Sequence, residues 1–294
     1  MTTTKVNPLE EKFAEYEAWL MQQPLSRHTK RAYQSRIRQF IKFLSQLHSS
    51  STSGQTPISR QAVLAYTSFL KSSLNAEPTS VNNSLTAIDH FCQFLGMEPS
   101  RVQRERAATV NPRTLTTEEQ QRFLQAVENR RSIRDKAMSY LFLYGGVRPG
   151  ECAALNIQDL VFSKTATKLV IQGNNQRDVV LNDVTAKILE SWLQERDSLV
   201  GNPKEEALFV NAQGRRLSTA GIDLIIRGIG WMAKLDLSAQ VLRHTCLANL
   251  ANSGSDLIAL AQMAGHKSLD TTRRYCGQST DSPKPPNPPS LATA

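Results

Sequence analysis

The sequence lacks several features that mark other classes of protein. No apolar stretch approaches the roughly 18 residues that a membrane-spanning helix requires, and the N-terminal MTTTKVNPLEEKF contains no apolar signal region. The cysteines lie far apart, form no C-x-x-C pair, and are Cys92, Cys152, Cys246 and Cys276. We therefore expect reduced thiols in a cytosolic protein, and neither an exported disulfide scaffold nor a zinc site.

Acidic residues are missing from one long N-terminal interval. Between Glu17 and Glu77 there is no Asp or Glu, and the whole chain has a formal net charge of +9. The basic residues of that interval are Arg27, Lys30, Arg31, Arg36, Arg38, Lys42, Arg60 and Lys71. Because solvated surfaces normally mix both signs, this stretch favours an anionic partner. Nucleic acid is the first interpretation, a membrane surface the second, and a soluble domain that is merely basic the third.

Residues 26–48 predict an amphipathic helix with Ser26 as its N-cap. The apolar residues that recur at helical spacing are Tyr33, Ile37, Phe40, Leu44 and Leu47. The basic residues that we take as candidate DNA contacts on this helix are Arg27, Lys30, Arg31, Arg38 and Lys42. Since at least Arg31, Arg38 and Lys42 fall away from the apolar stripe, one face can pack while the other meets phosphates.

Periodicity and turn residues predict a mainly α-helical chain with one small antiparallel β-hairpin. We expect a helical domain over 8–98, a polar, basic linker over 99–113, a mixed domain over 114–276 and a disordered, proline-rich tail over 277–294. The further helices are expected near 59–73, 79–95, 117–129, 132–145, 149–155, 184–196, 218–233, 240–252 and 256–264. Thr116 and Glu119 have capping-box spacing. The hairpin is expected from 168–172 and 177–181, around Gly173-Asn174-Asn175.

Three separated segments carry the chemistry. They are GGVRPGE at 145–151, SAQVLRHTCLANL at 238–250 and GHKSLDTTRRY at 265–275. In this order, behind a basic helical region, they resemble the tyrosine recombinase (phage integrase) family, and most closely its compact Xer-type members. The resemblance covers roughly residues 8–276 and includes S-x-x-T-x-x-x-Y from Ser26 to Tyr33 and L-T-x-E-E from Leu115. It implies a helical core-binding domain followed by a mixed α+β catalytic domain.

The resemblance implies a site-specific recombinase that cuts and rejoins DNA. Cutting and rejoining without loss of the bond energy requires a covalent intermediate between protein and DNA. A tyrosine suits this step because phenolate is both a fair nucleophile and a fair leaving group. Tyr275 matches the family's nucleophile, whose attack leaves a 3′-phosphotyrosyl link and a free 5′-hydroxyl and needs neither metal nor nucleotide cofactor. The alternative is a tyrosine that fills a core edge at the end of a helix.

The remaining matches surround the scissile phosphate in the family. Arg148 and Arg243 match its two catalytic arginines, whose guanidinium groups stabilise the negative charge on the oxygens of the pentacovalent transition state. His266 matches the histidine that bonds the phosphate, and Glu151 an acidic residue that orients the first arginine. The alternatives are surface arginines, a structural histidine and an ordinary first-turn glutamate.

Two positions depart from the family. Gln240 stands where a histidine usually manages the tyrosine's proton, and His244 lies one turn further on roughly the same helical face. The hairpin, Q-G-N-N-Q-R from Gln172, lacks the lysine that protonates the leaving oxygen. Lys168 is the candidate general acid, with Arg177 as another substitute cation. The alternative function is therefore a weak or inactive DNA-binding protein of recombinase descent that assists an active partner.

The expected partner is double-stranded DNA with inverted-repeat core sites. The resemblance implies a homotetramer on DNA, formed from a protein that is a monomer or weak oligomer when free, with no membrane contact. It also implies action in the prokaryotic cytoplasm, at the nucleoid. Phage integration, dimer resolution, transposon cointegrate resolution and inversion all fit, so integration of a mobile element is one expected role.

Overall fold

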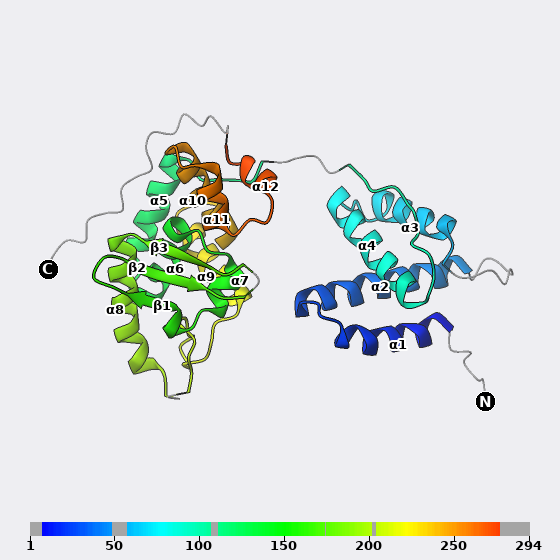
Figure 1. The fold of residues 1–294 in the computed structure, drawn as a ribbon, viewed down its shortest axis with the longest axis horizontal. Coiled ribbons are helices and arrows are strands. Elements are labelled where there is room, and N and C mark those ends of the chain that lie inside the picture. The colour runs from blue at the N-terminus through cyan, green and yellow to red at the C-terminus, as the bar shows by residue number, and fades with distance from the viewer. Residues whose placement is uncertain (1–7, 49–57, 107–110, 174, 202–203, 277–294) are drawn as a thin grey trace. The chain divides into compact units, whose positions relative to one another are not determined.

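The computed structural model describes residues 8–48, 58–106, 111–173, 175–201 and 204–276. The chain divides into two compact units, residues 1–109 and 110–294 (Figure 1). Most described residues are helical, and the strands form one small antiparallel sheet. The predicted fold class is therefore confirmed. The expected tail over 277–294 lies outside the described residues.

The first unit consists of helices in its described part, α1 (Pro8–Gln22), α2 (Arg27–His48), α3 (Arg60–Ser72) and α4 (Pro78–Phe94). Ser26 caps α2 as predicted, because its Oγ accepts from the backbone N–H of Thr29 at 3.0 Å. α1 is absent from the helices expected above. Its buried residues nevertheless recur at helical spacing, at Leu9, Phe13, Tyr16 and Leu20.

The core of the first unit is rich in aromatic rings. Tyr16 on α1 lies edge-on to Phe91 on α4, with 4.9 Å between ring centroids, and its hydroxyl lies 2.9 Å from His90 Nδ1. The apolar stripe predicted on α2 is confirmed for Ile37, Phe40 and Leu44, which are buried. Leu47 is 42% exposed, so the stripe ends before it.

The segment after α4 is anchored to that helix. Asp89 accepts from the backbone N–H and the hydroxyl of Ser100, at 2.9 and 2.7 Å. Asn82 exchanges two hydrogen bonds of 2.8 Å with the backbone of Glu105. Residues 100–105 of the expected linker therefore lie against the helical unit.

The second unit is built around α6, which is buried on every side from Ala137 to Leu143. α6 packs against α8, α10 and β3. Its helices are α5 (Thr117–Glu128), α6 (Ile133–Gly145), α7 (Pro149–Ala154), α8 (Asp183–Leu199), α9 (Thr219–Met232), α10 (Ala239–Asn252), α11 (Leu257–Ala264) and α12 (Leu269–Arg273), with a 3-10 turn η1 (Ile157–Asp159). The capping box of Thr116 and Glu119 is confirmed, and Ser132 caps α6.

The sheet has the order β1 (Leu160–Phe162), β2 (Thr167–Ile171) and β3 (Arg177–Leu181). The expected hairpin is confirmed as β2 and β3, whereas β1 and α12 are absent from the predicted elements. Leu169, Ile171 and Val179 are buried on one face of the sheet. Because side chains alternate along a strand, Arg177 points to that face and Lys168 to the opposite, solvent face.

Candidate active site

Three distant segments of the second unit are locked together by two arginines. Arg148 precedes α7 as its N-cap residue, and its Nη2 donates to the carbonyl of Gly265 at 2.7 Å. Arg243 on α10 donates from Nη2 to the carbonyl of Ala264 at 2.6 Å and from Nη1 to that of Gly146. The structure therefore brings GGVRPGE, the centre of α10 and the GHK turn to one place.

Arg243 lies deep in this cluster. It is 2% exposed, and burial together with the nearby Arg148 lowers its pKa to about 10. The guanidinium therefore stays charged at neutral pH. Arg148 and Arg177 bind the carboxylate of Glu151, and Arg243 adds a third guanidinium group nearby. The cluster therefore carries an excess of positive charge that attracts an anion.

Glu151 joins two of these arginines. Its carboxylate accepts from Arg148 Nη1 at 2.7 Å and from Arg177 Nη1 and Nη2 at 2.8 Å each. It also accepts from the backbone N–H of Arg148 at 2.8 Å, as a first-turn residue of α7 does. Burial alone would raise its pKa, but the hydrogen bonds from Arg177 and Arg148 prevail and hold the pKa at about 2. Glu151 thus both orients Arg148 and caps the helix.

Arg177 belongs to this cluster, although its sequence position suggested only a substitute cation. Its Nε donates to the carbonyl of Met263 at 2.6 Å, and its side chain is 7% exposed. With both Nη atoms on Glu151, the guanidinium is a brace between the hairpin, α7 and α11. The signal in the sequence was strand alternation, which turns a charged residue inward beside Val179 and Leu181.

His266 is held between the arginines and α12. Its Nε2 lies 3.4 Å from Arg243 Nη2, and its Nδ1 lies 2.9 Å from Thr272 Oγ1. Burial, followed by repulsion from Arg243 and Arg148, lowers the pKa of His266 to about 4. The ring is therefore neutral at pH 7, and because Nε2 accepts from Arg243, we assign the proton to Nδ1.

Gly265 allows this close assembly. Its φ of +62° lies in the left-handed region, and a Cβ built there would lie 2.9 Å from Arg177 Nη1 and 3.1 Å from Arg148 Nη1. A side chain at this position would push both guanidinium groups away. The glycine is therefore required by the backbone and by the arginines at once.

Tyr275 combines the two roles that its sequence position left open. Its ring is 3% exposed and packs with Leu247 and Leu260 at a core edge. Its hydroxyl, however, lies 2.6 Å from His244 Nδ1, and its ring stacks on that of His266 with 6.1 Å between centroids. Burial raises the pKa of Tyr275, and Arg243 opposes part of that rise. The ring of Tyr275 is therefore packed in the core, while its hydroxyl contacts the polar cluster.

Gln240 does not touch the tyrosine directly in this arrangement. Its Nε2 lies 3.3 Å from His244 Nε2, and His244 in turn reaches Tyr275. Burial, with Arg243, lowers the pKa of His244 to about 4, so this ring is also neutral. An amide has a donor and an acceptor end, so Gln240 serves either tautomer of the imidazole. His244, one helical turn after Gln240, is thus the residue that contacts the tyrosine hydroxyl.

Lys168 is not brought to this cluster. It lies on the solvent face of the sheet, where its Nζ is 3.7 Å from Asp178 Oδ2. The physical reason is strand alternation, which turns residue 168 away from the face that carries Arg177. The geometry therefore contradicts the interpretation of Lys168 as the general acid. Arg177 is also unsuited, because its guanidinium is fully engaged.

The candidate DNA contacts on α2 are mostly exposed, at Arg27, Arg31, Arg38 and Lys42. Two of the candidates have partners near α1: Arg38 donates to Glu17 at 2.8 Å, and Lys30 donates to the carbonyl of Met21 at 2.6 Å. Beside them, α2 lines a cleft of about 420 Å³ with α3 and α4. His28, Arg36 and Gln39 lie in it, and the candidate set omitted all three.

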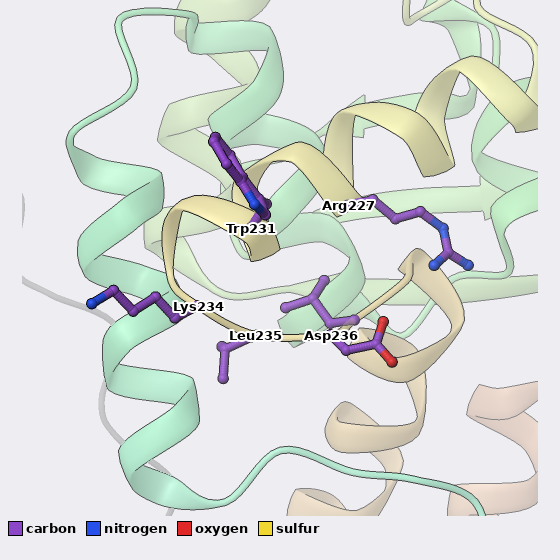
Figure 2. A pocket seen from close by; sticks show the side chains of 6 residues that line it. Arg227, Trp231, Lys234, Leu235 and Asp236 are labelled. Atoms are coloured by element: carbon purple, nitrogen blue, oxygen red, sulfur yellow. The ribbon is translucent and has the colours of Figure 1, made fainter.

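A separate hollow of about 350 Å³ lies at the end of α9 (Figure 2). Trp231, which is 82% exposed, lines it together with Arg227, Lys234 and Asp236. None of the predicted site residues belongs to it. Along the described ranges, the chain contains no helix long and apolar enough to cross a membrane.

Comparisons with known proteins agree with this architecture. Residues 113–281 match the phage integrase family, and residues 13–98 match the phage integrase N-terminal SAM-like domain. A tyrosine recombinase XerD of Oceanobacillus iheyensis is 30% identical over 263 residues, which are 85% of this chain and 88% of that protein. A XerC of Roseiflexus castenholzii is 30% identical over 266 residues, which are 85% and 83% of the two chains.

Solved structures share the fold. XerA recombinase is 25% identical, with a TM-score of 0.51 over 91% of this chain and 93% of the other. XerH, solved as a site-specific recombinase bound to its difH substrate, is 19% identical with a TM-score of 0.72 over 94% and 87%. A lambda integrase fragment bound to a core site is 15% identical, with a TM-score of 0.68 over 93% and 98%. The last two likenesses concern the fold.

Proposed function

This chain belongs to the phage integrase family of tyrosine recombinases, and we propose that it is a catalytically active site-specific DNA recombinase. One observation carries the proposal. The Tyr275 hydroxyl, 2.6 Å from an imidazole nitrogen, belongs to the same cluster as Arg148, Arg243 and His266. A nucleophile, a proton acceptor and a cationic anion site thus lie together.

The cluster suits a phosphodiester. Arg148 and Arg243 are each held by carbonyl or carboxylate oxygens, so their orientation exists before DNA arrives. Pre-oriented guanidinium groups stabilise the charge that grows on the non-bridging oxygens during phosphoryl transfer. The His266 ring beside Arg243 supplies a further polar contact on this side. These residues are proposed to hold the scissile phosphate within reach of the phenol.

We assign the proton of Tyr275 to His244. In the structure the amide nitrogen of Gln240 faces His244 Nε2. When this amide turns over so that its oxygen faces that nitrogen, His244 Nε2 carries the proton and Nδ1 accepts from the phenol. Burial is the main cause of the low pKa of His244, and repulsion from Arg243 adds to it. A bound phosphate diester would offset the repulsion from Arg243 and so raise this pKa in part. Binding of DNA would therefore strengthen the base at the moment when the phenol must lose its proton.

Tyr275 would then attack phosphorus, form a 3′-phosphotyrosyl link and release a 5′-hydroxyl, which later reverses the step from another strand. The substrate is proposed to be duplex DNA with inverted-repeat core sites, contacted by the basic residues of α2 and by the second unit. We further propose a homotetramer on DNA and action at the nucleoid, in the prokaryotic cytoplasm. Proteins of the same fold have been solved with a difH substrate and with transposon right end DNA, which supports DNA as the partner.

A second candidate function is a DNA-binding protein that assists an active partner without cutting. The observation that favours it is the hairpin, whose residues place no lysine beside the arginine cluster. Against it stands the cluster of Tyr275, Arg148, Arg243 and His266, which binding alone does not require.

Covalent trapping on DNA separates these candidates. Genomic fragments would be incubated with the protein, and adducts that survive denaturation would be recovered and sequenced to find the cleaved site. A duplex nicked beside that site would then trap the enzyme, because the short leaving strand diffuses away. We expect an adduct with the wild type and none with Tyr275→Phe, which keeps the packed ring. If DNA binds sequence-specifically but no adduct forms, the assisting role is correct.

A further inference from the structure

The chemistry proposed above requires a proton for the leaving 5′-oxygen, and the hairpin does not supply it. Gln172 donates to Asp159 Oδ1 at 3.1 Å, and Lys168 lies on the solvent face of the sheet. Arg177 gives Nε, Nη1 and Nη2 to fixed oxygens. A donor must therefore come from another element.

A cleft of about 270 Å³ lies between the hairpin turn and the turn that follows α11. The hairpin contributes Asn175, Gln176 and Arg177 to its lining, and the other side contributes Gly265, His266 and Lys267. Its cationic side chains are Arg177 and Lys267. The cleft thus contains both the histidine that contacts Arg243 and a lysine.

Lys267 is available, whereas Arg177 is not. Its side chain is exposed and has no hydrogen bond or ion pair with any residue that the structure describes. Its backbone is held on both sides, since the backbone N–H of His266 donates to the carbonyl of Ala261 at 3.0 Å and Ser268 caps α12. Because the backbone is held and the four-carbon side chain is free and flexible, the ammonium can move within the cleft.

We propose that Lys267 donates the proton to the leaving 5′-oxygen and thereby takes the place of the missing hairpin lysine. This inference rests on the proposed function. As Tyr275 Oη bonds to phosphorus, the bond from phosphorus to O5′ breaks and its electron pair passes to O5′. A proton from Lys267 Nζ completes the 5′-hydroxyl and leaves a neutral amine. In rejoining, that amine takes the proton of the attacking 5′-hydroxyl.

A sulfur substitution tests this role. Once the cleaved position is mapped, nicked duplexes are made with oxygen or with sulfur as the bridging 5′ atom. Thiolate needs no proton to leave, because a thiol is far more acidic than an alcohol. We expect Lys267→Ala to cleave the oxygen substrate on the order of 10²–10⁴-fold more slowly than the wild type, and the sulfur substrate at close to the wild-type rate.

Three variants complete the design. Arg148→Ala is expected to be slow on both substrates, because it acts on the phosphate and not on the leaving atom. Lys164→Ala removes another exposed lysine, in the turn between β1 and β2, and is expected to be neutral on both. Lys267→Arg keeps the charge but releases its proton too weakly, so it should stay slow on oxygen and fast on sulfur.

The outcomes are distinct. A wild-type rate of Lys267→Ala on oxygen, or an equal loss on both substrates, overturns the inference while leaving the proposed function intact. Full activity of Lys267→Arg on oxygen shows that charge alone suffices and overturns proton donation. Failure of the wild type to form an adduct with either substrate refutes the proposed function itself, and the role of Lys267 with it.

Discussion

Arg177 and Glu151 face each other through two parallel hydrogen bonds of 2.8 Å, Nη1 to Oε1 and Nη2 to Oε2. The same carboxylate holds Arg148 Nη1 at 2.7 Å. A residue on the hairpin therefore sets the position of an arginine that precedes α7, without touching it. This bidentate geometry is available to a guanidinium and not to an ammonium.

Replacing Arg177 with lysine tests this positioning role. Lysine keeps the charge but cannot bind both carboxylate oxygens in one plane, so Glu151 and Arg148 should shift. A misplacement of about 1 Å in a reacting group can cost on the order of 10²-fold in rate. We expect a loss of that size in single-turnover cleavage by Arg177→Lys, with DNA affinity nearly unchanged.

Arg227→Lys is the matched control, because Arg227 pairs with Asp223 on an exposed helix face at 2.7 Å. It should have the wild-type cleavage rate. If Arg177→Lys lowered both the DNA affinity and the melting temperature along with the cleavage rate, its role would be structural and not one of positioning.

His244→Asn tests the assigned proton acceptor. An asparagine oxygen stands near the place of Nδ1 and keeps a hydrogen bond to Tyr275, but it does not take up a proton near neutral pH. We expect cleavage on the order of 10²–10⁴-fold slower. The wild-type rate should fall as pH drops and His244 becomes protonated, and this acidic limb should vanish in the variant. A variant that keeps both the rate and the acidic limb would show that another group accepts the proton.

Acid should unfold the second unit through its two buried histidines. The pKa values of His244 and His266 fall from an ordinary 6.5 to about 4 on folding, so the unfolded chain binds more protons between these values. Their contribution to stability is complete above pH 6.5 and is lost as pH falls toward 4. Glu151, whose pKa falls from 4.5 to about 2, acts in a lower window.

Thermal melting between neutral pH and pH 4 measures this dependence. The melting temperature of the wild type should decline over that range, and the decline should be smaller in the double variant His244→Asn, His266→Asn. Identical slopes for the two proteins would mean that other groups control the acid transition.

Gly265→Ala should disturb the site more than its backbone strain alone explains. A non-glycine residue in the left-handed region costs on the order of 1–3 kcal/mol, and here the added Cβ also meets two guanidinium groups. Gly254→Ala is the matched control, because its φ is +84° and no atom lies within 4 Å of the added Cβ. Both variants should lose stability, whereas cleavage should fall only in Gly265→Ala. Equal cleavage by the two variants would contradict the crowding argument.

Charge reversal on α2 tests the DNA contacts of the first unit. Arg31→Glu with Arg38→Glu should weaken binding to any duplex, and each lost phosphate contact should reduce the slope of log affinity against log salt by about 0.9. Lys12→Glu, on α1 beside Glu15, removes an exposed basic residue outside this helix and serves as the control. Unchanged affinity and slope in the double variant would place the DNA on another face.

Most local elements, and four of the residues in the cluster, can be named from the sequence alone. Helix periodicity, the cap at Ser132 and the Thr116–Glu119 box depend on neighbours in the chain, and the structure contains them. Arg148, Arg243, His266 and Tyr275 stand in segments whose resemblance to a family singles them out without coordinates. Such features are local or positional, so one sequence displays them.

The tertiary structure alone decided which side chains contact one another in the site. Strand alternation and packing turned Arg177 inward and Lys168 outward. Only the tertiary placement of the segment after α12 brings the phenol of Tyr275 to His244 on α10. Arg177 and Glu151 are 26 positions apart in the chain, and His244 and Tyr275 are 31 positions apart. Their partners depend on how buried faces fit together in space, and a pattern of neighbours along the chain does not contain that information.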